Sequence, residues 1–277
     1  MSKFSILLCC FGDYPHFAQR ALVNIIAARN SSPFPVHVGM NDCGMITTNY
    51  LRGLYDAGSI DTLIESRSNI NKDPMMRLLL DRTQTEYIVW LDDDSYFGPD
   101  WHKELCRFID SSGRFDVAGK LATCARTPAY ERFLTARPWY VDSSRFSTDT
   151  KHVSRFALGG LFVARTAFLR EHNFPDKAMV KKHDDMLLGD LVEQQRGKLV
   201  PFSHELREQV FEDKGERRGS GEQEKDFLTV SPITVEEAGG QPRIRKGEHL
   251  QLQDEAYRLA ANGLLEEALQ RYLLALQ

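Results

Sequence analysis

Three consecutive acidic residues, Asp92, Asp93 and Asp94, directly follow the apolar run 87–91. Apolar residues without polar alternation predict a strand that helices cover on both faces, as in a parallel sheet. Because side chains alternate along a strand, we expect Asp92 and Asp94 to project to one side and Asp93 to the other. Carboxylates this close repel one another unless a cation or hydrogen-bond donors stabilise their charge. The triplet therefore predicts a divalent metal ion that holds a phosphorylated ligand.

The alternative for the triplet is a polar turn in which Asp92 or Asp94 caps the next helix. We favour the metal because ligands of open α/β sheets bind beyond the carboxyl ends of the strands. A second acidic pair, Asp184 and Asp185, opens a helix predicted within 181–196. One of these two acids can cap the helix, which leaves the other available as a general base.

The segments that must position these acids alternate between strand and helix patterns over the first hundred residues. Such alternation predicts a parallel, Rossmann-like sheet, although no GxGxxG motif follows the first strand. We expect strands at 4–11, 35–40, 62–64 and 87–91, and helices at 17–29, 49–57 and 74–82.

The second half continues the α/β pattern less regularly. Residues 122–155 are rich in Arg, Ser and aromatic residues, and we expect an irregular excursion that faces the substrate. Gly159 and Gly160 interrupt the strand predicted at 156–164, which indicates a bulge or a close backbone approach. The remaining predicted elements are a helix at 100–111, a strand at 115–121 and a last strand at 198–202.

Composition predicts a domain over residues 1–229, a linker over 230–248 and a helical hairpin over 249–277. The stretch 212–226 is rich in charged residues, Gly and Ser, and its composition predicts a mobile loop. The two helices of the hairpin, joined at Asn262-Gly263, resemble one tetratricopeptide repeat. Because one such hairpin cannot bury its apolar face alone, we expect self-association or a protein contact through it.

The bulk composition limits the possible partners and the compartment. A net charge of −4 gives no electrostatic reason to expect a nucleic acid. Five cysteines without a CxxC pair fit reduced thiols in the cytoplasm better than a disulfide framework. No apolar stretch approaches the roughly 20 residues of a transmembrane helix.

Several motifs then stand in an order that resembles the family 2 glycosyltransferases and their relatives with the GT-A fold, over about residues 4–205. The acidic triplet is the DxD element of this resemblance, and 183–188 is the late acidic helix start. The other matching pieces are Cys10-Phe11-Gly12, Asn41-Asp42, Asn71-Lys72 with Arg77, and Gly159-Gly160. The resemblance implies an α/β, Rossmann-like nucleotide-diphospho-sugar transferase fold with a small α-helical C-terminal extension.

The resemblance also implies roles for single residues. Asp94 and Asp92 would hold Mn²⁺ or Mg²⁺, with His204 as a third ligand, and Gly159 and Gly160 would line the acceptor and sugar pocket. The donor contacts would come from Phe11 against uracil, Asp42 at the base, Lys72, Arg77, Asp92 and Asp93 along the nucleotide, and Arg217 or Arg218 from the 212–226 loop acting as a lid.

The implied activity is a metal-dependent, inverting hexosyltransferase that uses a nucleotide-sugar donor, expected to be a UDP-sugar. Asp185, with Asp184 beside it, would take the proton from an acceptor hydroxyl. The acceptor is left open among a saccharide, a protein and a lipid-linked glycan.

Two other functions fit parts of the sequence. A haloacid dehalogenase-like phosphatase would use Asp92 as nucleophile, Asp94 as acid and base, and Asp184 with Asp185 as late metal ligands. That motif normally sits on the first strand of its fold, whereas three predicted strands precede Asp92 here. The other alternative is a non-catalytic interaction module of the tetratricopeptide type.

Overall fold

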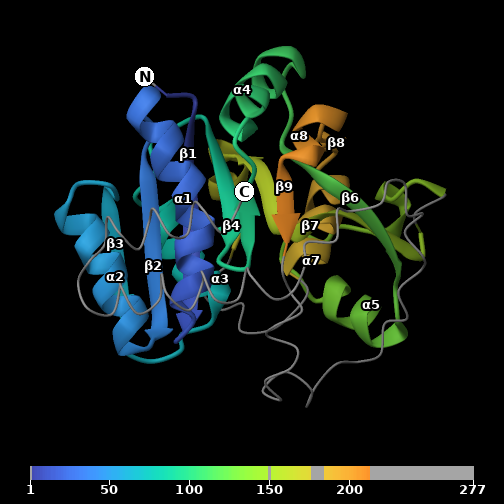
Figure 1. The fold of residues 1–277 in the computed structure, drawn as a ribbon. Coiled ribbons are helices and arrows are strands. Elements are labelled where there is room, and N and C mark those ends of the chain that lie inside the picture. Colours follow the sequence, from blue (N-terminus) through green and yellow to red (C-terminus); the bar gives the residue numbers. More distant parts are fainter. Residues whose placement is uncertain (1, 149–150, 176–183, 213–277) are drawn as a thin grey trace, which may run out of the picture.

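The computed structural model describes residues 2–148, 151–175 and 184–212. These residues form a seven-stranded sheet, order β3-β2-β1-β4-β7-β6-β8, with helices on both faces (Figure 1), and a two-stranded sheet of β5 and β9. The strands are β1 (Phe4–Gly12), β2 (Val36–Cys43), β3 (Thr62–Ser66), β4 (Tyr87–Asp92), β5 (Ser95–Phe97), β6 (Val117–Ala125), β7 (Val153–Arg165), β8 (Leu199–Pro201) and β9 (Val210–Glu212). The helices are α1 (Pro15–Ser31), α2 (Met45–Asp56), α3 (Lys72–Leu80), α4 (Trp101–Ser111), α5 (Pro128–Thr135), α6 (Thr166–Glu171), α7 (Asp184–Gln194) and α8 (His204–Glu208), with a 3₁₀ turn at Ser143–Arg145.

The linker 230–248, the hairpin 249–277 and all but the first residue of the 212–226 loop lie outside the described residues. No helix in the described part of the chain is long and apolar enough to cross a membrane.

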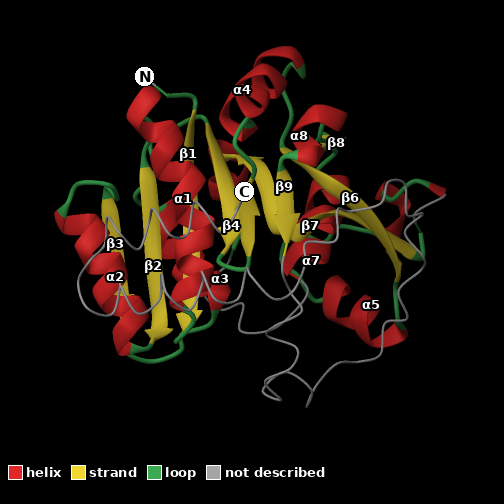
Figure 2. Cartoon of the chain, viewed as in Figure 1, coloured by secondary structure: helices red, strands yellow, loops and turns green. Residues whose placement is uncertain are grey.

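The first four strands of the large sheet, β3, β2, β1 and β4, are parallel, as the sequence predicts. Strand β7 then runs antiparallel to both β4 and β6 (Figure 2). Gly12 pairs with Cys43, and Cys9 pairs with Asp92, so the carboxyl ends of β1, β2 and β4 meet at one edge of the sheet. The polar residues that follow these strands are therefore brought together.

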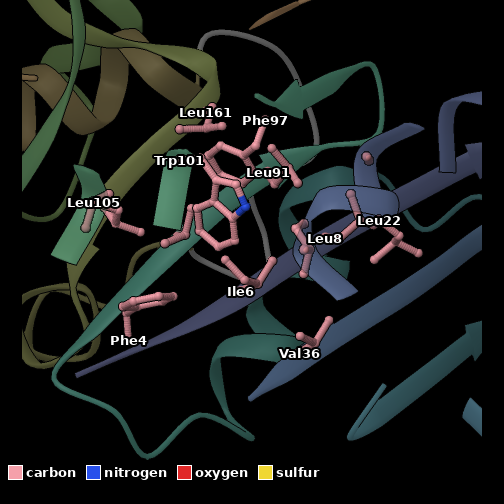
Figure 3. Packing of buried hydrophobic residues seen from close by; sticks show 14 of the residues in the cluster. Phe4, Ile6, Leu8, Leu22, Val36, Leu91, Phe97, Trp101, Leu105 and Leu161 are labelled. Carbon is pink, nitrogen blue, oxygen red and sulfur yellow. The ribbon is translucent and has the colours of Figure 1, made fainter. Parts of the chain in front are cut away.

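Alternate residues of the central strands face two apolar layers, because side chains of a strand alternate between the faces of a sheet. Ile6 and Leu8 of β1 belong to one cluster, which includes residues of α1, α2, α4 and α8. Figure 3 shows Leu22 of α1 and Trp101 of α4 in this cluster. Leu7 belongs to the opposite cluster with residues of α3, α5, α6 and α7. The prediction of central strands covered on both faces is confirmed.

The prediction of an irregular stretch over 122–155 is wrong at its two ends and in part of its interior. Strand β6 continues to Ala125, and β7 begins at Val153, because the two strands pair antiparallel over this length. Between them lies α5, whose first turn has Pro128 and whose N-cap Thr127 accepts a hydrogen bond from the Tyr130 amide.

The small sheet of β5 and β9 has no counterpart among the predicted elements. Ser95 pairs with Glu212 in this antiparallel ladder. Strand β4 ends at Asp92, a turn contains Asp93 and Asp94, and β5 starts at the next residue. The acidic triplet is thus held between a strand of the large sheet and a strand of the small one.

Candidate functional site

The acidic triplet lies where β4 and β7 separate. Their antiparallel pairing ends at Leu91 and Leu161, so Asp92 and Gly160 are the next residues on the two neighbouring strands. Asp93 and Asp94 are almost fully buried. The site therefore sits in the middle of the sheet, at the carboxyl edge of its parallel half.

Lys72, the first residue of α3, links the triplet to the second acidic pair. Its Nζ lies 3.2 Å from Asp92 Oδ2 and 2.8 Å from Asp184 Oδ2. Burial by itself would lower the pKa of Lys72, but the charges of Asp184 and Asp92 outweigh it and raise that pKa well above its usual value. A permanently charged ammonium thus joins two acids that lie far apart in the sequence.

Asp93 points toward a different neighbour. Its Oδ2 accepts a hydrogen bond of 3.0 Å from the backbone amide of Phe11, at the end of β1. The pKa of the buried Cys9 thiol is raised well above its usual value, first by burial and then by the charges of Asp93 and Asp92. The structure thus directs Asp92 toward α3 and α7 and Asp93 toward β1.

A cavity of about 220 Å³ opens beside these acids. Three side-chain amides contribute to its wall, and Asn41 donates to Asn69 Oδ1 at 3.1 Å and accepts from the Ile70 amide at 2.8 Å. Asp92 and Lys72 mark the side that faces the acidic cluster. The lining residues are Cys9, Phe11, Asn41, Asn69, Asn71, Lys72, Asp92 and Asp93.

Two residues predicted to contact the donor lie away from this cavity. Asp42 is exposed, with a left-handed φ of 57°, and its neighbour Asn41 lines the cavity instead. Arg77 donates to Asp81 Oδ1 at 3.0 Å and to Asn173 Oδ1 at 2.8 Å. Arg77 is five residues after Lys72 on the same helix, so it points about 140° away from it.

The Gly159–Gly160 pair allows two acidic side chains to approach β7. A Cβ atom at Gly159 would lie 3.2 Å from Asp185 Cβ and 3.4 Å from Asp185 Oδ2. A Cβ atom at Gly160 would lie 2.8 Å from Ser95 Oγ and 3.1 Å from Glu212 Oε1. The glycine pair therefore marks a close approach, which is one of the two outcomes that the sequence predicts.

Glu212 is the functional candidate that the sequence did not reveal. It is the last residue of β9 and stands beside Ser95, the residue after the triplet. In the sequence, Glu212 is the first acidic residue of the charged stretch 212–226, and no feature of that stretch distinguishes one acidic residue from another. Only the pairing of β5 with β9 brings it to the site.

The carboxylates present suit a hard divalent cation. Mg²⁺ and similar ions are often bound by one or two carboxylates together with the phosphate oxygens of a ligand, and Asp92 and Asp94 can supply these two. Among the described residues, no three His, Cys, Asp or Glu side chains form a group that could hold a metal ion. His204, at the start of α8, is exposed, and its Nε2 lies 3.6 Å from Glu208 Oε1. Within the described ranges it forms no metal-binding group with Asp92 and Asp94.

The two arginines predicted to cover the leaving group, Arg217 and Arg218, lie outside the described residues.

Asp73, the neighbour of Lys72 on α3, is the most strongly perturbed acid with a defined value. Burial first, and then the charge of Asp184, raise its pKa from 3.8 to about 8, against the opposing effect of Lys72. Its Oδ1 atom is buried and has no hydrogen-bond partner among the described residues. The native protein therefore holds a proton on Asp73 over a pH range in which the unfolded chain has lost it.

We expect Asp73→Asn to flatten the pH dependence of stability. The native state binds this proton more tightly than the unfolded state, so the free energy of unfolding of the wild type falls between about pH 4 and pH 8 and levels off above. The loss is at most about 1.4 kcal/mol per pH unit. Denaturant unfolding at pH 5.5 and 8.5 should show the variant gaining stability relative to wild type at the higher pH.

The matched control for this measurement is Asp110→Asn, which makes the same chemical change at an exposed position. It should follow the wild-type pH dependence. If Asp73→Asn also runs parallel to wild type, Asp73 is ionised in the native protein at neutral pH.

Comparisons with known proteins concern the fold. A scan against protein-family models and a search of curated proteins found no match. TarS from S. aureus in complex with UDP-GlcNAc has a TM-score of 0.51 at 15% identity, covering 98% of this chain and 72% of that chain. The mannosyltransferase PcManGT from Pyrobaculum calidifontis, in complex with GDP-Man and Mn²⁺, has a TM-score of 0.50 at 13% identity, covering 99% and 74%.

A longer TarS structure has a TM-score of 0.51 at 16% identity over 73% of this chain. This chain spans 35% of that structure and 58% of the TarS 1–349 structure. The likeness establishes the fold: a mixed α/β structure with a mostly parallel central sheet, as in glycosyltransferases with the Rossmann-like GT-A fold. The predicted α/β, Rossmann-like fold class is confirmed, and the predicted α-helical C-terminal extension lies outside the described residues.

Proposed function

We propose that this chain is a metal-dependent, inverting glycosyltransferase that moves a hexosyl group from a nucleotide-sugar donor to an acceptor hydroxyl. One observation carries the proposal. A cavity beside Asp92 and Asp93 and a second acidic pair on α7 converge on Lys72 at the carboxyl edge of the sheet. The shared fold with TarS and PcManGT, whose structures contain UDP-GlcNAc and GDP-Man, supports this reading.

The nucleoside of the donor would occupy the cavity of about 220 Å³. Phe11 offers a half-buried ring for stacking, and the amides of Asn41, Asn69 and Asn71 offer both donors and acceptors for a base. We expect a UDP-sugar.

The leaving group of this reaction is a diphosphate, on which negative charge develops as the glycosidic bond breaks. A divalent ion held by Asp92 and Asp94 would supply positive charge at this point. Lys72 lies at the edge of the same cavity and carries a fixed positive charge, so its ammonium can donate to a phosphate oxygen. The Lys72 contacts with Asp92 and Asp184 keep that group in place before the donor binds.

The proton of the acceptor hydroxyl would go to Asp185. Asp184 is already in an ion pair with Lys72, whereas Asp185 packs against Gly159 and accepts a hydrogen bond of 2.8 Å from the Met186 amide. The amino terminus of α7 favours an ionised carboxylate at this place. Direct attack on the face opposite the diphosphate would invert the anomeric configuration.

The test is a screen of nucleotide sugars against the full chain, first by thermal shift with Mn²⁺ and then by release of nucleoside diphosphate. A bound donor at a hundredfold excess over its Kd stabilises the protein by about 2.7 kcal/mol. We expect one class of nucleotide sugar to raise the melting temperature, and a chelator to abolish both this shift and the turnover.

Hydrolysis of a chromogenic phosphate ester without any donor dependence would instead identify a phosphatase that uses Asp92. Binding of no nucleotide sugar, together with no turnover of either kind, would favour an interaction module.

A further inference from the structure

A buried ion pair between Asp190 and Arg126 connects α7, the helix that starts with Asp184 and Asp185, to the rest of the described structure. Asp190, on the same helix, lies 2.6 Å from Arg126 through Oδ1, and the two side chains are 1% and 2% exposed. Arg126 follows directly after β6, so the pair connects α7 to the sheet. The pair lies in the interior, where an unsatisfied charge would be costly.

Further polar groups complete this Asp190 cluster. The second oxygen of Asp190, Oδ2, accepts from Tyr130 Oη and from Ser154 Oγ, both at 2.8 Å. Arg126 also donates to Ser154 Oγ at 3.1 Å and to the Lys151 carbonyl at 2.9 Å. Its guanidinium carbon lies 4.0 Å from the ring centroid of Phe146. Side chains from the residue after β6, from α5 and from β7 thus all contact one carboxylate of α7.

The residue before Asp190 sets how closely α7 approaches the sheet. A Cβ atom at Gly189 would lie 2.3 Å from the Arg155 carbonyl oxygen and 2.6 Å from Phe156 Cβ. Glycine is therefore required for this approach. Gly189 fixes the distance between α7 and β7, and Asp190 fixes the rotation of the helix and its position along its axis.

We infer that the Asp190 cluster is a positioning device for the acids at the start of α7. Asp185 is five residues before Asp190, about 7.5 Å along the helix axis, so a rigid helix transmits any shift of Asp190 to it. The contacts of Asp184 with Lys72 and of Asp185 with Gly159 both depend on this placement. The role in catalysis rests on the proposed function, whereas the placement of the helix does not.

Stability alone does not account for such a cluster. Replacing a buried ion pair by apolar side chains of similar volume is often neutral or stabilising, because desolvation offsets the attraction between the charges. A polar cluster whose members are mutually hydrogen-bonded accepts few alternative arrangements. It therefore suits a helix whose first turn must be held in one place, since a misplacement of about 1 Å near the reacting atoms can lower a rate a hundredfold.

The deciding variant is Tyr130→Phe, which removes one hydrogen bond to Asp190 and keeps the ring. Asp190→Asn is less informative, because it leaves the buried charge of Arg126 uncompensated and can prevent folding. The matched control is Tyr140→Phe, which also keeps its ring, here packed near Phe146. Within the described ranges the hydrogen bond of Tyr140 is made by its backbone amide, to the Arg137 carbonyl, and not by its hydroxyl. Turnover, the KM and Kd of the donor, and amide hydrogen exchange are compared in the 277-residue chain.

We expect Tyr130→Phe to lower kcat about 3- to 30-fold, to change the donor Kd by less than twofold, and to speed amide exchange over 186–188 without affecting α4. Tyr140→Phe should change none of these. A lower melting temperature with unchanged kcat and unchanged exchange at 186–188 would overturn the inference, and so would a loss of donor affinity that accounts for the whole effect. If wild type turns over no donor, the proposed function fails, and the exchange data alone still decide whether the cluster places α7.

Discussion

Replacing Asp185 by asparagine is expected to lower turnover by roughly 10²- to 10⁴-fold, the usual contribution of a general base. Asparagine keeps the size of the side chain and its ability to accept from the Met186 amide, but it cannot take a proton. The donor cavity does not include Asp185, so the donor Kd should change little. Steady-state kinetics with saturating acceptor, together with calorimetric titration of the donor, measure both quantities.

Asp184→Asn should affect turnover less and donor binding more. It removes the negative charge 2.8 Å from the Lys72 ammonium. Of the two ion pairs described for Lys72, only the one with Asp92 then remains. Asp110→Asn, on the exposed end of α4 where Asp110 pairs with Lys3, is the control for loss of an acid and should leave both quantities unchanged. If Asp184→Asn causes the larger fall in kcat, the base is Asp184, and if neither variant loses activity, neither acid is the base.

The second large effect is expected from Asp94→Asn. A carboxamide keeps the shape of this nearly buried side chain but removes the negative charge that would hold the cation. Loss of a group that only orients a metal ligand typically lowers metal affinity 10- to 100-fold, so loss of a ligand itself should cost at least about a hundredfold. We expect UDP binding in the presence of Mn²⁺ to fall to the level that wild type shows with a chelator.

Isothermal titration of UDP with and without Mn²⁺ measures this effect, and circular dichroism checks that the variant is folded. Asp110→Asn again serves as the control. An Asp94→Asn protein that retains the Mn²⁺ dependence of wild type would place the cation elsewhere, and Glu212, beside Ser95, is the next carboxylate to replace.

The parallel half of the fold follows from the sequence because each of its elements is specified locally. The run before Asp92 is apolar on both faces, and α1 starts at Pro15 after a Gly-Asp-Tyr turn. The strands at 4–11 and 87–91 agree with β1 and β4 to within one residue. Buried strands between amphipathic helices have few alternative arrangements, so the pattern is sufficient.

The parts that the sequence does not reveal depend on contacts between distant segments. Strands β5 and β9 have three residues each and exist because they pair with one another. Helix α5 is held by the bond of Tyr130 to Asp190, sixty residues further on. Contacts between such distant segments cannot be predicted from the pattern of polar and apolar residues within either segment.

The same limit applies to single site residues. Asn41 rather than Asp42 lines the cavity. Asp42 has a left-handed φ of 57° and lies at the irregularity of the β1–β2 pairing, where Asn41 and Cys43 pair with successive residues of β1. Arg77 donates hydrogen bonds to Asp81 and Asn173 because it lies on a different face of α3 from Lys72. Lys72, in contrast, is at the start of that helix, where its ammonium lies beside Asp92 and Asp184 and lines the cavity. The resemblance implies a donor contact for Lys72, and its pairing with the two acids is seen only in the structure.

The two edge strands of the large sheet bear on how copies of this molecule can associate. An exposed strand edge offers unpaired backbone groups to another chain, and proteins limit this by short edges, charged side chains and proline. At one edge β8 has three residues and ends in Pro201, which has no amide hydrogen to donate. At the other, β3 has five residues, and Glu65 forms an ion pair with Arg52. Either edge strand therefore offers few free backbone groups to which a strand of another molecule could hydrogen-bond. This protects the described part of the chain against misassembly through its sheet.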